Sequence, residues 1–118
     1  MRVYCYSKCS TCKKAVKWLD EQGIAYDLID IKEDNPDKEN LEKWYKMSGL
    51  PLKRFFNTSG MQYRQLGLKD KLADMSEEEQ LSLLATDGML VKRPLVVGKD
   101  FVLTGFKEEQ WKERMTDV

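Results

Sequence analysis

Histidine is absent from the 118 residues of the chain. Its absence excludes histidine general bases, Cys–His nucleophile pairs and Cys₂His₂ zinc sites. Cysteine is scarce as well, because the only three, Cys5, Cys9 and Cys12, lie within eight positions of one another. One chain therefore cannot complete a Cys₄ site, and we predict neither a metal site nor a bound cofactor.

Neither sign of charge is in excess, and long apolar runs are missing. Lysine plus arginine and aspartate plus glutamate number 20 each, so no basic excess indicates direct binding to nucleic acid. No apolar stretch approaches the ~20 residues of a membrane span, and residues 1–7 are too short and polar for a secretion signal. We expect a cytoplasmic protein with no membrane partner, in which clustered cysteines serve catalysis or redox sensing rather than structural disulfides.

The apolar pattern predicts a single α/β domain over residues 1–118. Strands are expected at 2–6 and 24–31, with a helix at about 10–22 between them. A strand–helix–strand unit of this length requires a parallel, right-handed pairing of its strands. Further helices are expected from residue 37 to residue 87, followed by a strand pair and a closing helix at 107–115.

The motif Cys9-Ser10-Thr11-Cys12 lies where the first strand gives way to the first helix. At a helix N-terminus, unpaired backbone N–H groups and the positive end of the dipole favour an anion. A cysteine there, in a Cys-X-X-Cys motif, can have a pKa of ~3.5–7.5. We predict that Cys9 is the nucleophile and that Cys12, on the inward helix face, is the resolving thiol. The alternative is two structural cysteines at helical spacing.

Polar residues around the motif are candidates for substrate binding. Lys8, Lys13 and Lys14 are predicted to form a cationic rim that stabilises the Cys9 thiolate or an oxyanion substrate. The predicted substrate-binding residues are Lys8, Ser10, Thr11, Lys13 and Pro94. The alternative for the lysines is ordinary solvated charge. The third cysteine, Cys5, is predicted to be a buried thiol that acts as a small apolar residue.

Arg93-Pro94 is the second motif, at the entrance to an apolar strand, where no ladder donor is needed. With a cis peptide, Pro94 would expose backbone beside the thiols. Arg93 would then offer a fork of donors to an oxyanion or a mixed-disulfide partner. The alternative is a trans proline beside a surface arginine.

Together these motifs resemble the ArsC/Spx family, and most closely its small Spx/MgsR-type, arsenate-reductase-like members. The resemblance is carried by residues 6–15, Arg93-Pro94 and residues 105–109, and it covers essentially the whole chain. It implies a thioredoxin-like fold with a helical insertion at about 41–87, between the second and third strands. It also implies a cis peptide before Pro94.

The resemblance further implies a thiol-dependent oxidoreductase with a redox-active Cys9–Cys12 disulfide. In glutaredoxin-linked arsenate reductases, a thiolate matching Cys9 attacks arsenate, which three arginines hold. Only Arg93 matches one of these arginines, because Asn57 and the stretch 104–106 stand at the other two. Those enzymes have serine where this chain has Cys12. The substrate implied is an oxyanion or a protein disulfide, and the reductant is glutathione with glutaredoxin or another thiol system.

The Spx branch implies an alternative function. Its members are redox-sensing transcriptional regulators that bind the C-terminal domain of the RNA polymerase α subunit. In that case the same cysteine pair would act as a switch, and the polymerase would be the partner.

Overall fold

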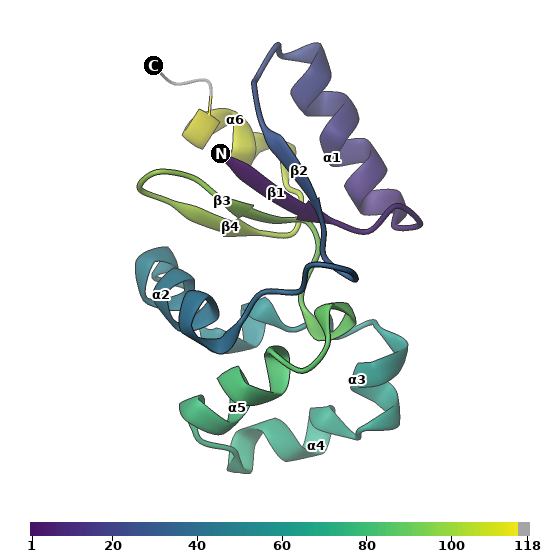
Figure 1. The fold of residues 1–118 in the computed structure, drawn as a ribbon, viewed down its shortest axis with the longest axis vertical. Coiled ribbons are helices and arrows are strands. Elements are labelled where there is room, and N and C mark those ends of the chain that lie inside the picture. Colours follow the sequence, from purple (N-terminus) through teal and green to yellow (C-terminus); the bar gives the residue numbers. More distant parts are fainter. Residues whose placement is uncertain (116–118) are drawn as a thin grey trace.

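A computed structural model describes residues 1–115; residues 116–118 of the predicted domain lie outside the described residues. The strands are β1 (Arg2–Cys5), β2 (Asp27–Asp30), β3 (Leu95–Val97) and β4 (Val102–Thr104). The α-helices are α1 (Ser10–Glu21), α2 (Lys38–Ser48), α3 (Met61–Gln65), α4 (Leu68–Lys71), α5 (Glu77–Leu84) and α6 (Glu108–Met115) (Figure 1). Short 3₁₀ turns are η1 (Leu52–Phe55), η2 (Leu72–Asp74) and η3 (Gly88–Leu90). Within residues 1–115, every helix is too short or too polar to cross a bilayer.

The four strands form one mixed sheet in the order β2-β1-β3-β4. β1 pairs in parallel with β2, which confirms the predicted strand–helix–strand unit, and β3 is antiparallel to both β1 and β4. β2 is shorter than the predicted strand at 24–31. The reason is that β1 offers four residues, so pairing runs only from Arg2 opposite Asp27 to Cys5 opposite Asp30.

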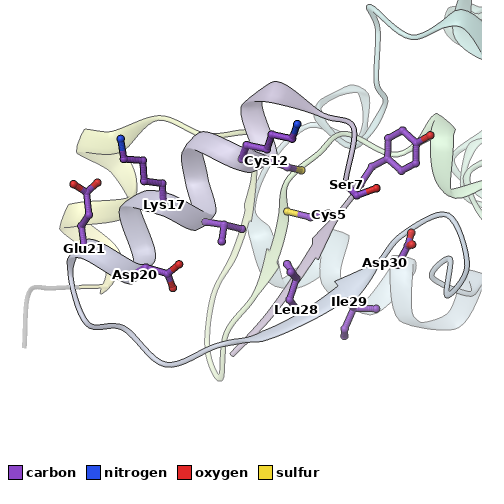
Figure 2. A pocket seen from close by; sticks show the side chains of 12 residues that line it. Cys5, Ser7, Cys12, Lys17, Asp20, Glu21, Leu28, Ile29 and Asp30 are labelled. Carbon is purple, nitrogen blue, oxygen red and sulfur yellow. The ribbon is translucent and has the colours of Figure 1, made fainter.

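Helices cover both faces of the sheet, and alternation along β1 decides which residues each face receives. Tyr4 points to the side of α2, where its ring packs against Trp44 at a tilt of 50°, with ring centroids 5.4 Å apart. Val3 and Cys5 point to the side of α1 and α6. Figure 2 shows Cys5 reaching from β1 toward Cys12 on α1. One face of the sheet therefore holds two of the three thiols in a single apolar layer.

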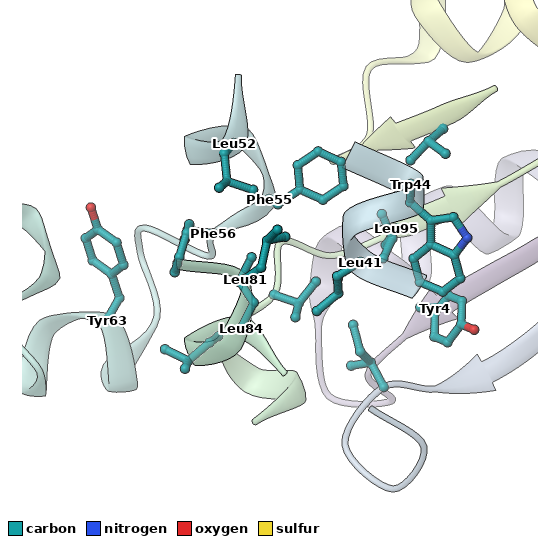
Figure 3. Packing of buried hydrophobic residues seen from close by; sticks show 14 of the residues in the cluster. Tyr4, Leu41, Trp44, Leu52, Phe55, Phe56, Tyr63, Leu81, Leu84 and Leu95 are labelled. Carbon is teal, nitrogen blue, oxygen red and sulfur yellow. The ribbon is translucent and has the colours of Figure 1, made fainter. Parts of the chain in front are cut away.

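The helices α2 to α5 lie between β2 and β3, where the helical insertion was predicted. They pack around a second apolar cluster that includes Phe55, Phe56 and Leu84 (Figure 3). α2 begins at Lys38, which confirms the expected start of the helices at residue 37, because Asp37 caps it by accepting a hydrogen bond from the Asn40 N–H at 2.8 Å. The insertion therefore begins slightly before the approximate boundary at 41.

The insertion returns to the sheet at Gly88. A Cβ at this position would collide with the backbone carbonyl of Ile31, just after β2. Only glycine therefore permits the close contact that joins the insertion to the end of the sheet carrying the thiols.

Candidate active site

Cys9 occupies the N-cap position of α1, as predicted. Its φ and ψ angles are −90° and 118°, and its carbonyl accepts the Lys13 N–H at 3.1 Å. Its own N–H donates to the Tyr6 carbonyl at 3.0 Å, which closes the turn between β1 and α1. No side chain caps the helix, and the Cys9 thiol is half-buried. This thiol lies at the lip of the site, beside the positive end of the helix dipole.

Cys12 and Cys5 lie beneath Cys9, on facing elements. Cys12 is 2% exposed and Cys5 is 6% exposed, which confirms that both point into the core. Both belong to one apolar cluster, and Figure 2 shows the two sulfurs close to each other between α1 and β1. All three cysteines are free thiols.

Hydrogen bonds lower the pKa of the Cys12 thiol to about 6. The hydrogen bond from Cys5 contributes most, and burial opposes it. The backbone N–H of Tyr6, the Cys9 thiol and the positive charge of Arg93 lower the pKa further. The helix-terminus argument places the thiolate on Cys9, whereas these hydrogen bonds converge on Cys12.

Cys5 keeps its proton. Its hydrogen bond to Cys12 raises the pKa of Cys5, and burial together with the charge on Cys12 raises it further. The directions of the two pKa shifts favour a proton on Cys5 and a negative charge on Cys12. The predicted burial of Cys5 is confirmed, whereas its position against Cys12 was not anticipated from the sequence. The sequence does contain a signal for this contact. Strand alternation places Cys5 on the same face as Val3, and helical spacing places Cys12 on the same face as Ala15, so both thiols point into the layer between β1 and α1.

The Arg93–Pro94 peptide is cis, as the resemblance implies. Pro94 is buried, and its carbonyl accepts the Gly105 N–H at 2.9 Å. The Arg93 guanidinium lies 5.6 Å from the centre of the Tyr6 ring, and Nη1 is 3.4 Å from the Met89 carbonyl. Its Nε is buried without a hydrogen-bond partner. Arg93 therefore packs behind the cysteine turn, from where its charge reaches the thiols.

Two grooves divide the predicted substrate-binding residues. Lys13 lines a groove of about 640 Å³ between α1 and β2, in which Cys5 and Cys12 also lie (Figure 2). Thr11 lines a different groove of about 560 Å³. Lys8 and Ser10 are exposed and line neither groove. The structure thus separates Lys13 from Thr11 on the two sides of the start of α1.

The groove beside Thr11 has a basic lining that the sequence did not reveal. Among residues 1–115, its charged side chains are all positive: Lys53, Arg54, Lys92 and Lys107. They come from the insertion, from the segment before Arg93 and from the segment before α6. Because these segments are far apart in the chain, no local pattern indicates that their charges meet.

In the described part of the chain, no group of three or more cysteine, aspartate or glutamate side chains is placed to hold a metal ion. The chemistry that these residues can perform themselves is thiol chemistry, with one thiol at the surface and a stabilised thiolate below it.

Comparison with known proteins relates this site to one family. The model of the ArsC family matches residues 4–114. The uncharacterized protein YusI of Bacillus subtilis is 58% identical over 110 residues, which are 93% of this chain and 93% of YusI. The global transcriptional regulator Spx 2 of Bacillus cereus is 21% identical over 108 residues, which are 92% of this chain and 81% of Spx 2.

Solved structures agree with this relation. An ArsC family related protein from Bacteroides fragilis superposes with a TM-score of 0.93 at 55% identity, covering 95% of this chain and 94% of that one. Arsenate reductase from Vibrio cholerae superposes with a TM-score of 0.82 at 29% identity, covering 96% and 97%. These neighbours confirm the predicted thioredoxin-like fold.

Proposed function

Because the chain belongs to the ArsC family, we propose that it is a thiol-dependent oxidoreductase that uses Cys9 and Cys12 as a redox pair. The observation that carries this proposal is the arrangement of the two thiols. Cys9 is half-buried at the start of α1, while Cys12 is buried below it and accepts hydrogen bonds that stabilise a thiolate. An accessible attacking thiol above a buried resolving thiol is what two-step thiol exchange requires.

The proposed reaction has two steps. In the first, the Cys9 thiolate attacks one sulfur of a substrate disulfide, the S–S bond breaks, and one substrate thiolate leaves. In the second, the Cys12 thiolate attacks Cys9 Sγ and the other substrate thiolate leaves. The substrate gains two electrons, and the pair becomes the Cys9–Cys12 disulfide. Glutathione with glutaredoxin, or another thiol reductant protein, would return two electrons to the pair.

With arsenate, the same residues would reduce arsenic instead of sulfur. Cys9 would displace one oxygen of arsenate, which leaves as water, to form an S–As bond. Cys12 would then attack Cys9 Sγ, and the electron pair of the S–As bond would leave with arsenic as arsenite. Arg93 would support both reactions through its positive charge beside the thiols.

The basic groove beside Thr11 supports an anionic substrate. Its positive side chains lie next to the exposed residue between the two cysteines. We propose that these side chains, together with Thr11 and the exposed Lys8 and Ser10, attract an oxyanion or an acidic disulfide. Of the other predicted binding residues, Lys13 lines the other groove and Pro94 is buried. Each charge-assisted hydrogen bond would contribute on the order of 1.5–3 kcal/mol.

The cysteine roles are tested by following single variants with a disulfide substrate and intact-mass analysis. We expect that Cys9→Ser abolishes both the mixed disulfide and turnover. Cys12→Ser should accumulate the mixed disulfide on Cys9 and lose turnover, because the resolving thiol is missing. Full turnover by Cys9→Ser would refute the mechanism.

The substrate class is tested by measuring whether arsenate slows alkylation of Cys9. Neutralising the groove with Lys53→Gln and Arg54→Gln should weaken any protection by arsenate. Lys99→Gln, in the turn between β3 and β4, is the matched control because it removes a positive charge outside the groove. No protection in the unmodified protein would exclude arsenate and leave disulfides as the substrate.

A second candidate function is redox-sensing regulation through the RNA polymerase α subunit. It is favoured by the relatives that are named Spx and by Asn57, which stands where the arsenate reductases have an arginine. The test is binding of the reduced and the oxidised protein to the C-terminal domain of the α subunit. Absence of binding in both redox states would rule this candidate out.

A further inference from the structure

We propose that Cys5 is a positioning residue of the thiol site, whose Sγ–H donates to the Cys12 sulfur and holds Cys12 as the thiolate that leaves when the Cys9–Cys12 disulfide is reduced. This role rests on the redox pair proposed above and adds a third thiol that acts through Cys12 without exchanging electrons itself.

The backbone fixes Cys5 in place for this role. Cys5 is the last residue of β1, where it lies opposite Asp30 in the parallel pairing with β2. Its carbonyl accepts the Ile31 N–H at 2.9 Å, so the strand stays paired at this point. Alternation along β1 then directs the side chain to α1, and Figure 2 shows it facing Cys12. A buried thiol on a paired strand is a rigid hydrogen-bond donor and an inaccessible nucleophile.

The charges around the two sulfurs make this donor necessary. The charged side chains that line the groove in front of them are Lys13, Lys17, Asp20 and Glu21 from α1 and Asp30 from β2. Because carboxylates outnumber lysines there, the lining of this groove does not favour an anion. Arg93, from the segment before β3, adds one positive charge. A thiolate buried at Cys12 therefore needs donors close by, and Cys5, Cys9 and the Tyr6 N–H are the groups that lower the pKa of Cys12.

The role of Cys5 appears in the reductive step. An external thiolate attacks Cys9 Sγ, the Cys9–Cys12 bond breaks, and its electron pair goes to Cys12 Sγ. The departing sulfur becomes an anion at the site where Cys5 donates. A second external thiolate then releases Cys9 from the mixed disulfide. Because a hydrogen bond to a thiolate is stronger than one to a disulfide sulfur, Cys5 favours the reduced pair.

The first test measures the Cys12 thiolate in isolation and does not depend on disulfide formation. In a Cys9→Ser chain, adding Cys5→Ser or Cys5→Ala leaves Cys12 as the only thiol. Ultraviolet absorbance of the thiolate against pH then gives its titration midpoint. We expect a lower midpoint with Cys5→Ser, which keeps a hydroxyl donor, than with Cys5→Ala. Equal midpoints would overturn the proposal.

The second test measures the redox equilibrium in glutathione buffers. In the otherwise unmodified chain, Cys5→Ala should shift the equilibrium constant about tenfold toward the Cys9–Cys12 disulfide, since one charge-assisted hydrogen bond is lost. Cys5→Ser keeps a donor, so its equilibrium constant should lie close to that of the unmodified chain. If Cys5→Ala does not fold, the pair Cys5→Val and Cys5→Thr makes the same comparison at matched shape.

The two proposals fail in different ways. If the unmodified chain forms no Cys9–Cys12 disulfide, the proposed function is wrong, and the single-thiol titration still decides the role of Cys5. If the disulfide forms, and Cys5→Ser and Cys5→Ala change the redox equilibrium constant equally, only the role of Cys5 is wrong. A Cys5–Cys12 disulfide found by peptide mapping would also contradict a donor role.

Discussion

Lowering of the Cys12 pKa has a consequence for stability that can be measured without a substrate. Unfolded cysteine has a pKa of about 8.5, whereas the hydrogen bonds from Cys5 and the Tyr6 N–H lower the folded value for Cys12 to about 6. Below pH 6 both states hold the proton, so the shift contributes nothing. Between the two pKa values the unfolded state binds more protons, so the reduced protein becomes more stable as the pH rises.

The size of the effect follows from the separation of the two pKa values. Each pH unit between them contributes about 1.4 kcal/mol per proton, so a separation of about 2.5 units gives up to about 3 kcal/mol. Cys12 is 2% exposed, so bulk water does little to screen the interaction. Above pH 8.5 the free energy of unfolding falls as the pH rises, because the unfolded state loses the Cys5 proton that the folded state keeps. Reduced protein should therefore be most stable near pH 8.5.

The assay is urea unfolding at pH 6, 7 and 8.5 in the presence of a reductant, compared with Cys12→Ser. The chain has no histidine to titrate in this pH range. All other titratable groups are present in both proteins, so the difference between the two proteins isolates the Cys12 thiol. We expect the free energy of unfolding to rise from pH 6 to 8.5 in the unmodified protein and not in Cys12→Ser. An equal rise of this free energy in both proteins would refute the assignment of the thiolate to Cys12.

Two further predictions concern the insertion. Gly88→Ala should lower the free energy of unfolding by about 1–3 kcal/mol, because the new Cβ collides with the Ile31 carbonyl; an unchanged urea midpoint would contradict this close contact. Ser76→Ala should cost about 1 kcal/mol, because it removes the hydroxyl that accepts the Glu79 N–H at 3.1 Å, and thermal melting against the exposed Ser82→Ala in the same helix checks this.

Much of the fold could be predicted because its signals are local. The start of α1 at Ser10 follows from the strand–turn–helix pattern. The end of α1 follows from Gly23, which has a positive φ of 67°. The caps at Asp37 and Ser76 fix the starts of α2 and α5 in the same way. The exact length of β2 was not predictable from its own residues, because its partner β1 determines how many can pair.

The site was predictable only where one helix or one motif defines it. Helical spacing alone places Cys12 inward and Cys9 at the helix start. The basic groove could not be found in this way, because Lys53, Lys92 and Lys107 meet only after the insertion and the last strands have packed. The sequence predicts the thiolate on Cys9 because a helix terminus is the one electrostatic feature visible in it. The influence of Cys5 on Cys12 was not visible, because Cys5 lies on another element.

The position of the thiolate constrains which substrates the proposed enzyme could reduce. A pair whose reduced form is stabilised has a higher reduction potential, and so is a weaker reductant than a pair without that stabilisation. Structural disulfides, which resist reduction, are then poor substrates, and stronger oxidants are better ones. The same stabilisation makes Cys12 a good leaving group, so external thiols should reset the pair readily. If Cys5→Ala lowers the potential, that variant should reduce stable disulfides further toward completion than the unmodified protein does, while its own regeneration by glutathione becomes less favourable.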